Sequence, residues 1–327
     1  MHLMKNKINY FLVVSTLLFV VSCKKANDTV PVPEPVNPTE IDKTEVITWK
    51  FDSFIVDDLN VKQVFPGAIF TIRENGNDLE VVSLKDKYTP LPITASTSLV
   101  GEINNSFKDV PSSEKIAAYA KSLPIKNDNE SLAYSEDEFK DYNVLKYYLS
   151  NNDDVKSVFE KIGITTSTRI TKKHAAYFFS NHIKFSLDMN LPTKTELLSI
   201  ADVEKINTTN NAYYINSVMY GNNTLILAEA DTDYAILKNA LKALLLKQEL
   251  TPAQIQSLST AKVTFYARGG SEKSFIKIAK GSEEIKAANK EFEIFNNTAI
   301  SYPISYSLHS VKNFTLFKHE IKVNMIH

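Results

Sequence analysis

Cysteine is almost absent from this chain, and glycine and tryptophan are scarce. One cysteine in 327 residues excludes a disulfide framework and a cysteine-based metal site. The 37 basic and 38 acidic side chains nearly cancel, so the composition indicates no broad basic surface for nucleic acid. Stability must therefore come from packing, and a hydrophobic content of 43% is ample for a large core.

The motifs of common enzyme classes are missing as well. There is no Gly-x-Ser-x-Gly elbow, no phosphate-binding glycine loop and no His-Glu-x-x-His pair. Paired acids at 153–154 and 283–284 are expected to be solvated faces or helix N-terminal charges rather than a catalytic dyad. The sequence therefore predicts a protein that is not an enzyme and that has no cofactor and no metal. The histidines do not pair at metal-ligand spacing and are expected on the surface or at sheet edges: His2, His174, His182, His309, His319 and His327.

The first 22 residues are typical of a signal peptide. Lys5 and Lys7 precede an apolar run over 8–21 that is too short for an ordinary spanning helix. Ser22 then places a small residue before Cys23, as a lipoprotein signal peptidase requires. A plain secretory signal with an incidental cysteine is the alternative, but Cys23 is the chain's single cysteine and occupies the lipobox position. We expect lipid on Cys23 to anchor the protein to the bacterial outer membrane or cell surface, facing outward or into the periplasm.

Residues 23–45 are expected to form a tether. Four prolines between 31 and 38 favour extended polyproline II, and large apolar side chains other than valine are nearly absent. The folded body is therefore predicted to span 46–327.

The body is predicted to be of the α+β class. Fifteen tyrosines and eighteen phenylalanines favour sheet structure. The clearest pattern lies at 183–191, where apolar residues alternate without a break, as in a strand with one buried face. Helical spacing predicts helices at 112–122, 138–162, 233–249 and 282–290. Further strands are predicted at 64–73, 79–84, 91–95, 131–136, 213–228, 262–268, 274–278, 303–309 and 314–324.

Several separated segments resemble the thiol-activated, cholesterol-dependent cytolysins, a family of pore-forming proteins. Residues 64–70, VFPGAIF, resemble the family's tyrosine-proline-glycine-alanine-leucine segment, and 91–93 resemble the strand after it. Residues 214–221, YINSVMYG, are similar to serine-serine-valine-alanine-tyrosine-glycine-arginine. Residues 263–270, VTFYARGG, resemble the segment with paired glycines, and 300–307, ISYPISYS, resemble tyrosine-proline-isoleucine-serine-tyrosine-threonine. Their order and spacing agree with the family over about 240 residues.

The resemblance implies a MACPF/cytolysin-like architecture. It consists of a twisted antiparallel β-sheet core flanked by two helical clusters, here at about 137–180 and 233–262, with an elongated β linker near 64–95 and 303–324. Family members continue into a C-terminal sandwich domain that docks on membranes, whereas this sequence stops at His327. It has no tryptophan-rich loop with a reactive cysteine, so direct cholesterol binding is not expected.

The resemblance also implies that the clusters refold into membrane-spanning hairpins. A spanning strand needs alternate apolar residues over about ten positions. The second cluster meets this need on one parity, while Lys238, Lys242, Lys262 and Thr264 lie on the other. The competing interpretation is a leucine stripe that belongs to an ordinary helical core. The first cluster is polar without clear alternation. The candidate inserting residues are Leu237, Leu241, Ala243, Leu245, Val263 and Phe265.

Gly269 and Gly270 are the candidate hinge. Adjacent glycines weaken strand pairing and tolerate sharp bends, so they could let the short strand near 274–278 leave the sheet edge. An ordinary bulge or turn is the alternative. Tyr220 and Gly221 are interpreted as packing and turn geometry.

The leading hypothesis is a pore-forming or ring-assembling lipoprotein that pairs sheet edges and inserts hairpins. Its partners would be a lipid membrane and either copies of itself or a related cytolysin-like protein. The alternative is a non-lytic binding or adhesion lipoprotein, or a partner component, that uses the same fold without insertion.

Overall fold

A computed structural model describes most of the predicted body. Asp42–His327 forms one compact unit. The structure describes 44–326 except 57–59, 76–77, 100–104, 126–130, 150–152, 165–166, 191–196, 208–210, 247, 270–273 and 297–301. The predicted signal peptide, Cys23, most of the tether and Gly270 lie outside the described residues.

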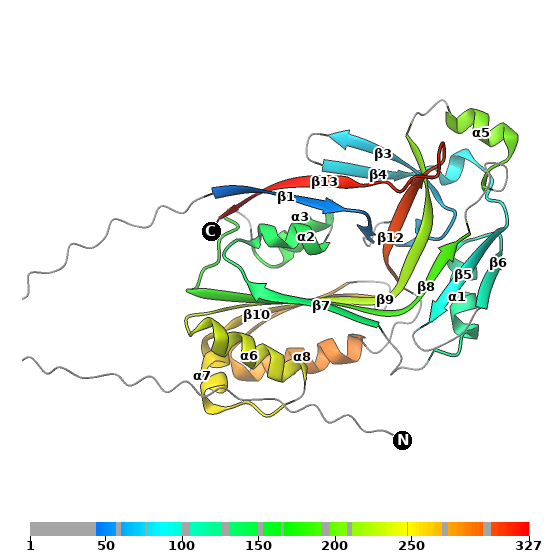
Figure 1. The fold of residues 1–327 in the computed structure, drawn as a ribbon. Helices are drawn as coiled ribbons and strands as arrows, with labels where there is room; N and C mark the ends of the chain where they lie inside the picture. The colour runs from blue at the N-terminus through cyan, green and yellow to red at the C-terminus, as the bar shows by residue number, and fades with distance from the viewer. Residues whose placement is uncertain are drawn as a thin grey trace, which may run out of the picture. The chain divides into compact units, whose positions relative to one another are not determined.

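Two long antiparallel strands lie at the centre of the large sheet (Figure 1). They are β8, His174–Met189, and β9, Ala212–Ala230. The strand predicted at 183–191 is confirmed as the second half of β8, which begins nine residues earlier than expected. The earlier half was missed because Ala175–Phe179 is apolar on both faces and shows no alternation.

Nine shorter strands complete an 11-stranded sheet around this pair, and its main path runs β11-β10-β9-β8-β5-β6. Strand β7 pairs with β8, β3 and β12 pair with β9, β4 pairs with β3, and β2 pairs with β12. The bounds are β2 Phe54–Ile55, β3 Ile69–Asn75, β4 Asp78–Ser83, β5 Ile93–Leu99, β6 Asn105–Asp109, β7 Ser131–Glu138, β10 Lys262–Arg268, β11 Phe275–Lys280 and β12 Pro303–Ser310.

The helices mostly follow the predicted periodicity. Helix α1, Ser113–Ser122, begins after Ser112, whose hydroxyl accepts a hydrogen bond from the Lys115 amide at 3.2 Å. The continuous helix predicted at 138–162 is instead three short elements. Asp141 caps the first of them, and its carboxylate accepts from the Asn143 amide at 2.8 Å. The remaining bounds are η1 Val61–Gln63, η2 Lys85–Lys87, η3 Tyr142–Val144, α2 Leu145–Leu149, α3 Asp153–Lys161, α5 Ile200–Asn207, α6 Tyr234–Leu245, α7 Pro252–Thr260 and α8 Ser282–Asn296.

A separate two-stranded ribbon joins the two ends of the body. It pairs β1, Thr44–Phe51, with β13, His319–Ile326, in antiparallel register. Part of the predicted linker near 303–324 lies in this ribbon, because β13 begins at His319, whereas β3, β4 and β5 near 64–95 belong to the large sheet. β12 also pairs with β9 rather than in the ribbon. β1 was missed because its apolar alternation spans only eight residues directly after the proline-rich segment, and it begins two residues before the predicted body.

A bend divides the long strand pair into two parts. Gly221 has φ +151°, and its amide donates to the Tyr302 carbonyl at 2.8 Å. Opposite Gly221, a register shift between Ile183 and Phe185 leaves one extra residue in β8, which is a β-bulge. The Phe185 ring stacks on Tyr220 with 4.6 Å between centroids. The interpretation of 220–221 as packing and turn geometry therefore holds for the described structure.

Replacing Gly221 tests this bend. In Gly221→Ala the new Cβ would lie 1.9 Å from the His182 carbonyl oxygen, so we expect a loss of about 3 kcal/mol in the free energy of unfolding. Gly163→Ala is the matched control, because Gly163 also has positive φ, at +79°, but has no neighbouring atom within 4 Å. It should lose about 1 kcal/mol through backbone strain alone. Equal losses in urea unfolding would show that steric contact at the bend is unimportant.

Candidate membrane-inserting segments and sheet edge

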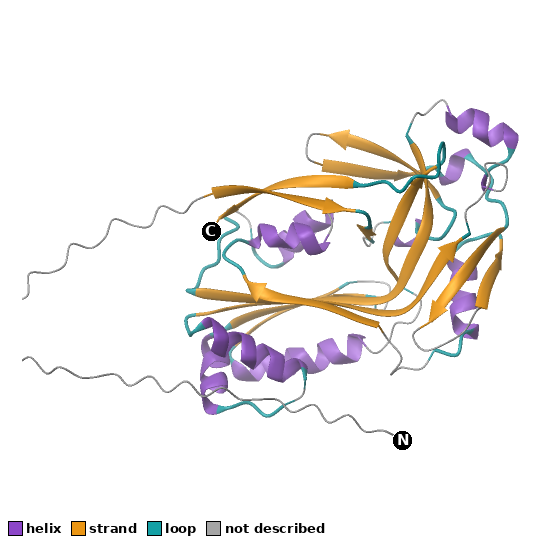
Figure 2. Cartoon of the chain, viewed as in Figure 1, coloured by secondary structure: helices purple, strands orange, loops and turns teal. Residues whose placement is uncertain are grey.

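The part of the sheet below the bend contains 175–179 of β8 and 225–228 of β9, and it is apolar on both faces. Helices cover each of these faces (Figure 2). Side chains of alternate residues point in opposite directions from a strand. Ala176, Ile226 and Phe265 therefore pack in one core with α6, α7 and α8. Ala175 and Leu225 pack in a second core with η3, α2 and α3. Helices of both predicted clusters thus lie against this sheet, but residues 174–180 of the first predicted cluster belong to strand β8.

The second cluster brings most of the predicted inserting residues together. Leu237 and Leu241 of α6 are fully buried, and they share a core with Val263 and Phe265 of β10. Leu245 packs at the edge of the same core. Ala243 is also buried, with 4% of its surface exposed. In the folded chain these residues form a helix-on-sheet core, as the competing interpretation requires. Their insertion into a membrane stays a prediction.

N-capping side chains mark the starts of the two helices in the second cluster. The Asp233 carboxylate accepts from the Ala235 amide at 2.9 Å at the start of α6. Thr251 and Gln254 form a reciprocal capping box at the start of α7. The cluster is therefore two short helices rather than one rod. Within the residues that the structure describes, no helix is long and apolar enough to cross a bilayer.

Charged contacts attach α6 to the neighbouring strand β7. Glu136 of β7 lies 3.7 Å from the Lys238 ammonium and 3.9 Å from that of Lys242. The Lys238 ammonium also lies 5.4 Å from the centre of the Tyr234 ring. These are the lysines that occupy the polar parity of the second cluster. Their pairing with β7 could not be predicted, because about 100 residues separate the partners in sequence.

Glu229 is a buried carboxylate that holds the first cluster to the end of β9. Its exposed fraction is 1%, and it accepts from the Tyr142 hydroxyl and from the Thr171 amide and hydroxyl, the latter two at 2.6 Å. The Lys172 amide adds a fourth donor at 3.1 Å. Burial and the adjacent Glu229 charge raise the pKa of Tyr142 well above its ordinary value, so the phenol stays a donor. We call Glu229, Tyr142 and Thr171 the β9 latch.

The ribbon covers the outer side of the first cluster (Figure 1). The rings of Trp49 and Phe51 each lie 5.3 Å from that of Tyr147 in α2. The side-chain amide of Asn143 donates through Nδ2 to the Asn324 backbone carbonyl at 3.2 Å. Movement of the first cluster away from the sheet therefore requires the ribbon to separate from α2.

Strand β11 covers the outer edge of β10, as expected for the short strand near 274–278. Lys262 to Ala267 pair with Lys280 to Phe275 in antiparallel register. Gly269 directly follows β10 with φ +101°, and a Cβ there would lie 2.3 Å from the Gly221 carbonyl oxygen. Only glycine fits this approach to β9. Whether Gly269 is also a hinge stays a prediction, and Gly270 and Cys23 lie outside the described residues.

His319 lies among aromatic rings. It is in the two-stranded ribbon, where each strand is a sheet edge as expected, and its ring stacks on Phe54 and Phe51 at centroid distances of 4.5 and 5.1 Å. Burial lowers the pKa of His319 to about 4, so the ring is neutral near neutral pH. The aromatic neighbours come from β1 and β2, which sequence reasoning did not connect with residue 319.

The β9 latch can be tested by unfolding. Glu229→Ala leaves buried donors without an acceptor, so we expect a loss of about 3 kcal/mol in the free energy of unfolding, and Tyr142→Phe should lose about 1 kcal/mol. The double variant should lose less than the sum, because both changes disrupt one network. Asp231→Asn is the control, since its ion pair with Lys172 is solvent-exposed and should change the free energy of unfolding little. Additive losses, with unchanged hydrogen exchange over 142–172, would contradict the latch.

The geometry agrees with known structures. The matches include a non-hemolytic pneumolysin from Streptococcus pneumoniae strain ST306, with 17% identity, 88% of this chain and 65% of that chain covered, and a TM-score of 0.65. Listeriolysin O matches with 15% identity, coverage of 87% and 62%, and a TM-score of 0.65. Suilysin from Streptococcus suis matches with 16% identity, coverage of 87% and 65%, and a TM-score of 0.60. The chain thus spans less than two thirds of the length of these proteins.

Sequence comparison shows which part of the chain resembles the cytolysins. The comparison with curated proteins found no match. The model of the thiol-activated cytolysin family matches residues 193–320, which include β9, the second cluster, β10, β11 and β12. The structural matches extend this likeness to the α+β fold as a whole. Residues 193–320 thus resemble the thiol-activated cytolysins in sequence, and the described chain shares the fold of the matched cytolysin structures.

Proposed function

We propose that this chain is a membrane-anchored protein that assembles into rings and forms pores by refolding its second helical cluster into a β-hairpin. The observation that carries the proposal is the alternation of apolar residues in α6. Leu237, Leu241, Ala243 and Leu245 are all odd-numbered, so in an extended strand they would lie on one face of that strand. Val263 and Phe265 already share one face of β10. The buried face of α6 would then become the lipid-facing side of a barrel strand.

The lysines that alternate with these apolar residues support the same refolding from helix to β-hairpin. Lys238 and Lys242 would lie on the opposite face of the extended α6 segment from Leu237 and Leu241, where a water-filled lumen accepts charge. Before insertion, Lys238 and Lys242 pair with Glu136. Refolding would break these pairs and release a lysine-bearing segment into a wet environment, which limits the penalty for desolvation.

Assembly requires a free strand edge. The outer edge of β10 pairs with β11 in the monomer, so another subunit could pair there only after β11 leaves. The strands are joined by 269–274, which contains the predicted hinge. We propose that displacement of β11 starts subunit pairing and that Gly269 and Gly270 permit the movement.

Anchoring is proposed to depend on Cys23. Replacement by serine removes the thiol that diacylglycerol would modify. We expect Cys23→Ser to abolish incorporation of labelled fatty acid and to move the protein from the membrane fraction to the soluble fraction. Thr29→Ser, which lies in the predicted tether and keeps both Ser22 and Cys23, is the control. Undiminished labelling of the serine variant would exclude this attachment site.

The edge mechanism is tested by a reversible lock. Lys262 and Lys280 are direct antiparallel partners, so cysteines at both positions meet the Cα separation that a disulfide needs. In the lipidated chain, we expect the oxidised lock to abolish dye release from liposomes and ring formation, and reductant to restore both. The control is a Thr94→Cys, Lys108→Cys pair, which joins β5 to β6 in the same way. It should leave release unchanged.

Other outcomes separate the alternatives. Dye release that persists with the oxidised lock would contradict displacement of β11. Pore formation by another route would then remain the proposed function. Absence of release from any membrane by the unlocked chain would favour the non-lytic binding lipoprotein or partner component. The fold does not decide between these functions, since one of the matching structures is of a pneumolysin described as non-hemolytic.

A further inference from the structure

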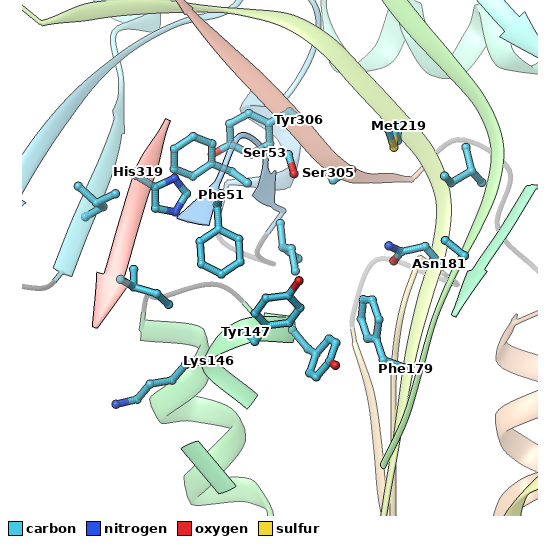
Figure 3. A pocket seen from close by; sticks show the side chains of 17 residues that line it. Phe51, Ser53, Lys146, Tyr147, Phe179, Asn181, Met219, Ser305, Tyr306 and His319 are labelled. Atoms are coloured by element: carbon cyan, nitrogen blue, oxygen red, sulfur yellow. The ribbon is translucent and has the colours of Figure 1, made fainter. Parts of the chain in front are cut away.

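An aromatic cavity of about 390 Å³ lies where the ribbon, α2 and the sheet meet (Figure 3). Phe51 and His319 line it from the ribbon, Tyr147 from α2, and Phe179 from β8. Met219 of β9 lines its opposite side. A volume at the lower end of the range for ligand pockets suits a small molecule rather than a protein segment.

Exposed apolar surface collects at this cavity. Tyr147 and Met219 expose 42% and 39% of their surface although both are large hydrophobic residues. Apolar side chains that remain exposed together in a concave site are typical of ligand-binding surfaces. Ser53, Asn181 and Ser305 add a few polar groups. The cavity is thus suited to an apolar body with limited hydrogen bonding.

The charged residue that lines the cavity is basic. Among the described lining residues, Lys146 is the one lysine, arginine, aspartate or glutamate, and burial lowers the pKa of His319 to about 4. Lys146 lies at the edge beside Tyr147 in Figure 3, with its ammonium directed away from the cavity centre. A ligand with a charged head at this edge would therefore be an anion whose head remains in water.

We propose that this cavity binds an anionic amphiphile of the fatty acid class, with its acyl chain among the aromatic rings and its carboxylate near Lys146. The bound chain would contact the ribbon, α2 and the sheet together. It would thereby stabilise the ribbon on the first helical cluster. Binding itself does not depend on pore formation, so it can be measured without a membrane.

Trp49 is a natural reporter for this site. It is the only tryptophan in the chain, and its ring lies 5.3 Å from that of the cavity-lining Tyr147. The full mature chain is titrated with 12-bromododecanoate below its micelle concentration, because bromine quenches nearby tryptophan fluorescence. We expect saturable quenching with one site per chain. Absence of saturable quenching would overturn the proposal.

Competition defines the ligand class. Unlabelled dodecanoate should displace the brominated probe, whereas dodecylammonium should compete poorly because Lys146 repels it. Decanoate should bind about 15-fold more weakly than dodecanoate, which corresponds to about 0.8 kcal/mol for each of the two missing CH₂ groups. Equal competition by the anion and the cation would contradict the assigned head-group charge and overturn the proposal.

Variants connect the binding to the cavity. Ala133→Phe and Met219→Phe place bulk at two separate lining positions, so each should reduce affinity at least ten-fold while Trp49 remains in place. Either variant suffices if the other does not fold. Lys146→Gln should weaken dodecanoate binding about two- to five-fold, as expected for a partly exposed charge pair. Lys156→Gln, an exposed lysine on α3, is the matched control. Binding unchanged by filling the cavity would place the ligand elsewhere and overturn the proposal.

Discussion

The pairing of β8 with β9 is the interaction on which the rest of the structure depends. It extends from His174–Ala230 at one end to Asp188–Ser217 at the other, interrupted only by the bulge opposite Gly221. Below the bend, the pair is apolar on both faces, so each face must be covered to remove it from water. Most helices that cover these faces lie in the segments between β7 and β8 and between β9 and β10, and α8 directly follows β11. Chain connectivity therefore makes each covering helix an extension of the strands that it covers.

This arrangement is held by two kinds of contact. Apolar packing by residues such as Leu237 and Leu241 is nondirectional and can be exchanged for lipid contacts with little loss. The β9 latch is directional, since the Glu229 carboxylate satisfies donors from two parts of the first cluster. Breaking it leaves buried polar groups unpaired. In the proposed function, the apolar core would supply the inserted surface, while the latch and the ribbon would resist premature opening of the first cluster.

Much of the local structure could be predicted from sequence. The alternation at 183–189 required a strand, and Ser112 with the following helix formers fixed the start of α1. Helical spacing also found α6 and α8. Predictions failed where local pattern was short or mixed, as in β1, or where tertiary contacts broke a periodic run, as at Asp141. The cavity was beyond sequence reasoning, because Phe51, Tyr147 and His319 are widely separated along the chain.

The sequence by itself determined the α+β class, the order of the elements and the family likeness, because these depend on residue periodicity and on motifs within short segments. Tertiary structure alone decided which faces are covered and which charges meet. Glu136 reaches Lys238, and Glu229 reaches Tyr142 and Thr171, only because antiparallel pairing brings distant strand ends together. Tertiary structure also explains why position 269 requires glycine, since the carbonyl that excludes a side chain there belongs to Gly221 in another strand. Local patterns specify elements, whereas long-range contacts depend on how the elements pack.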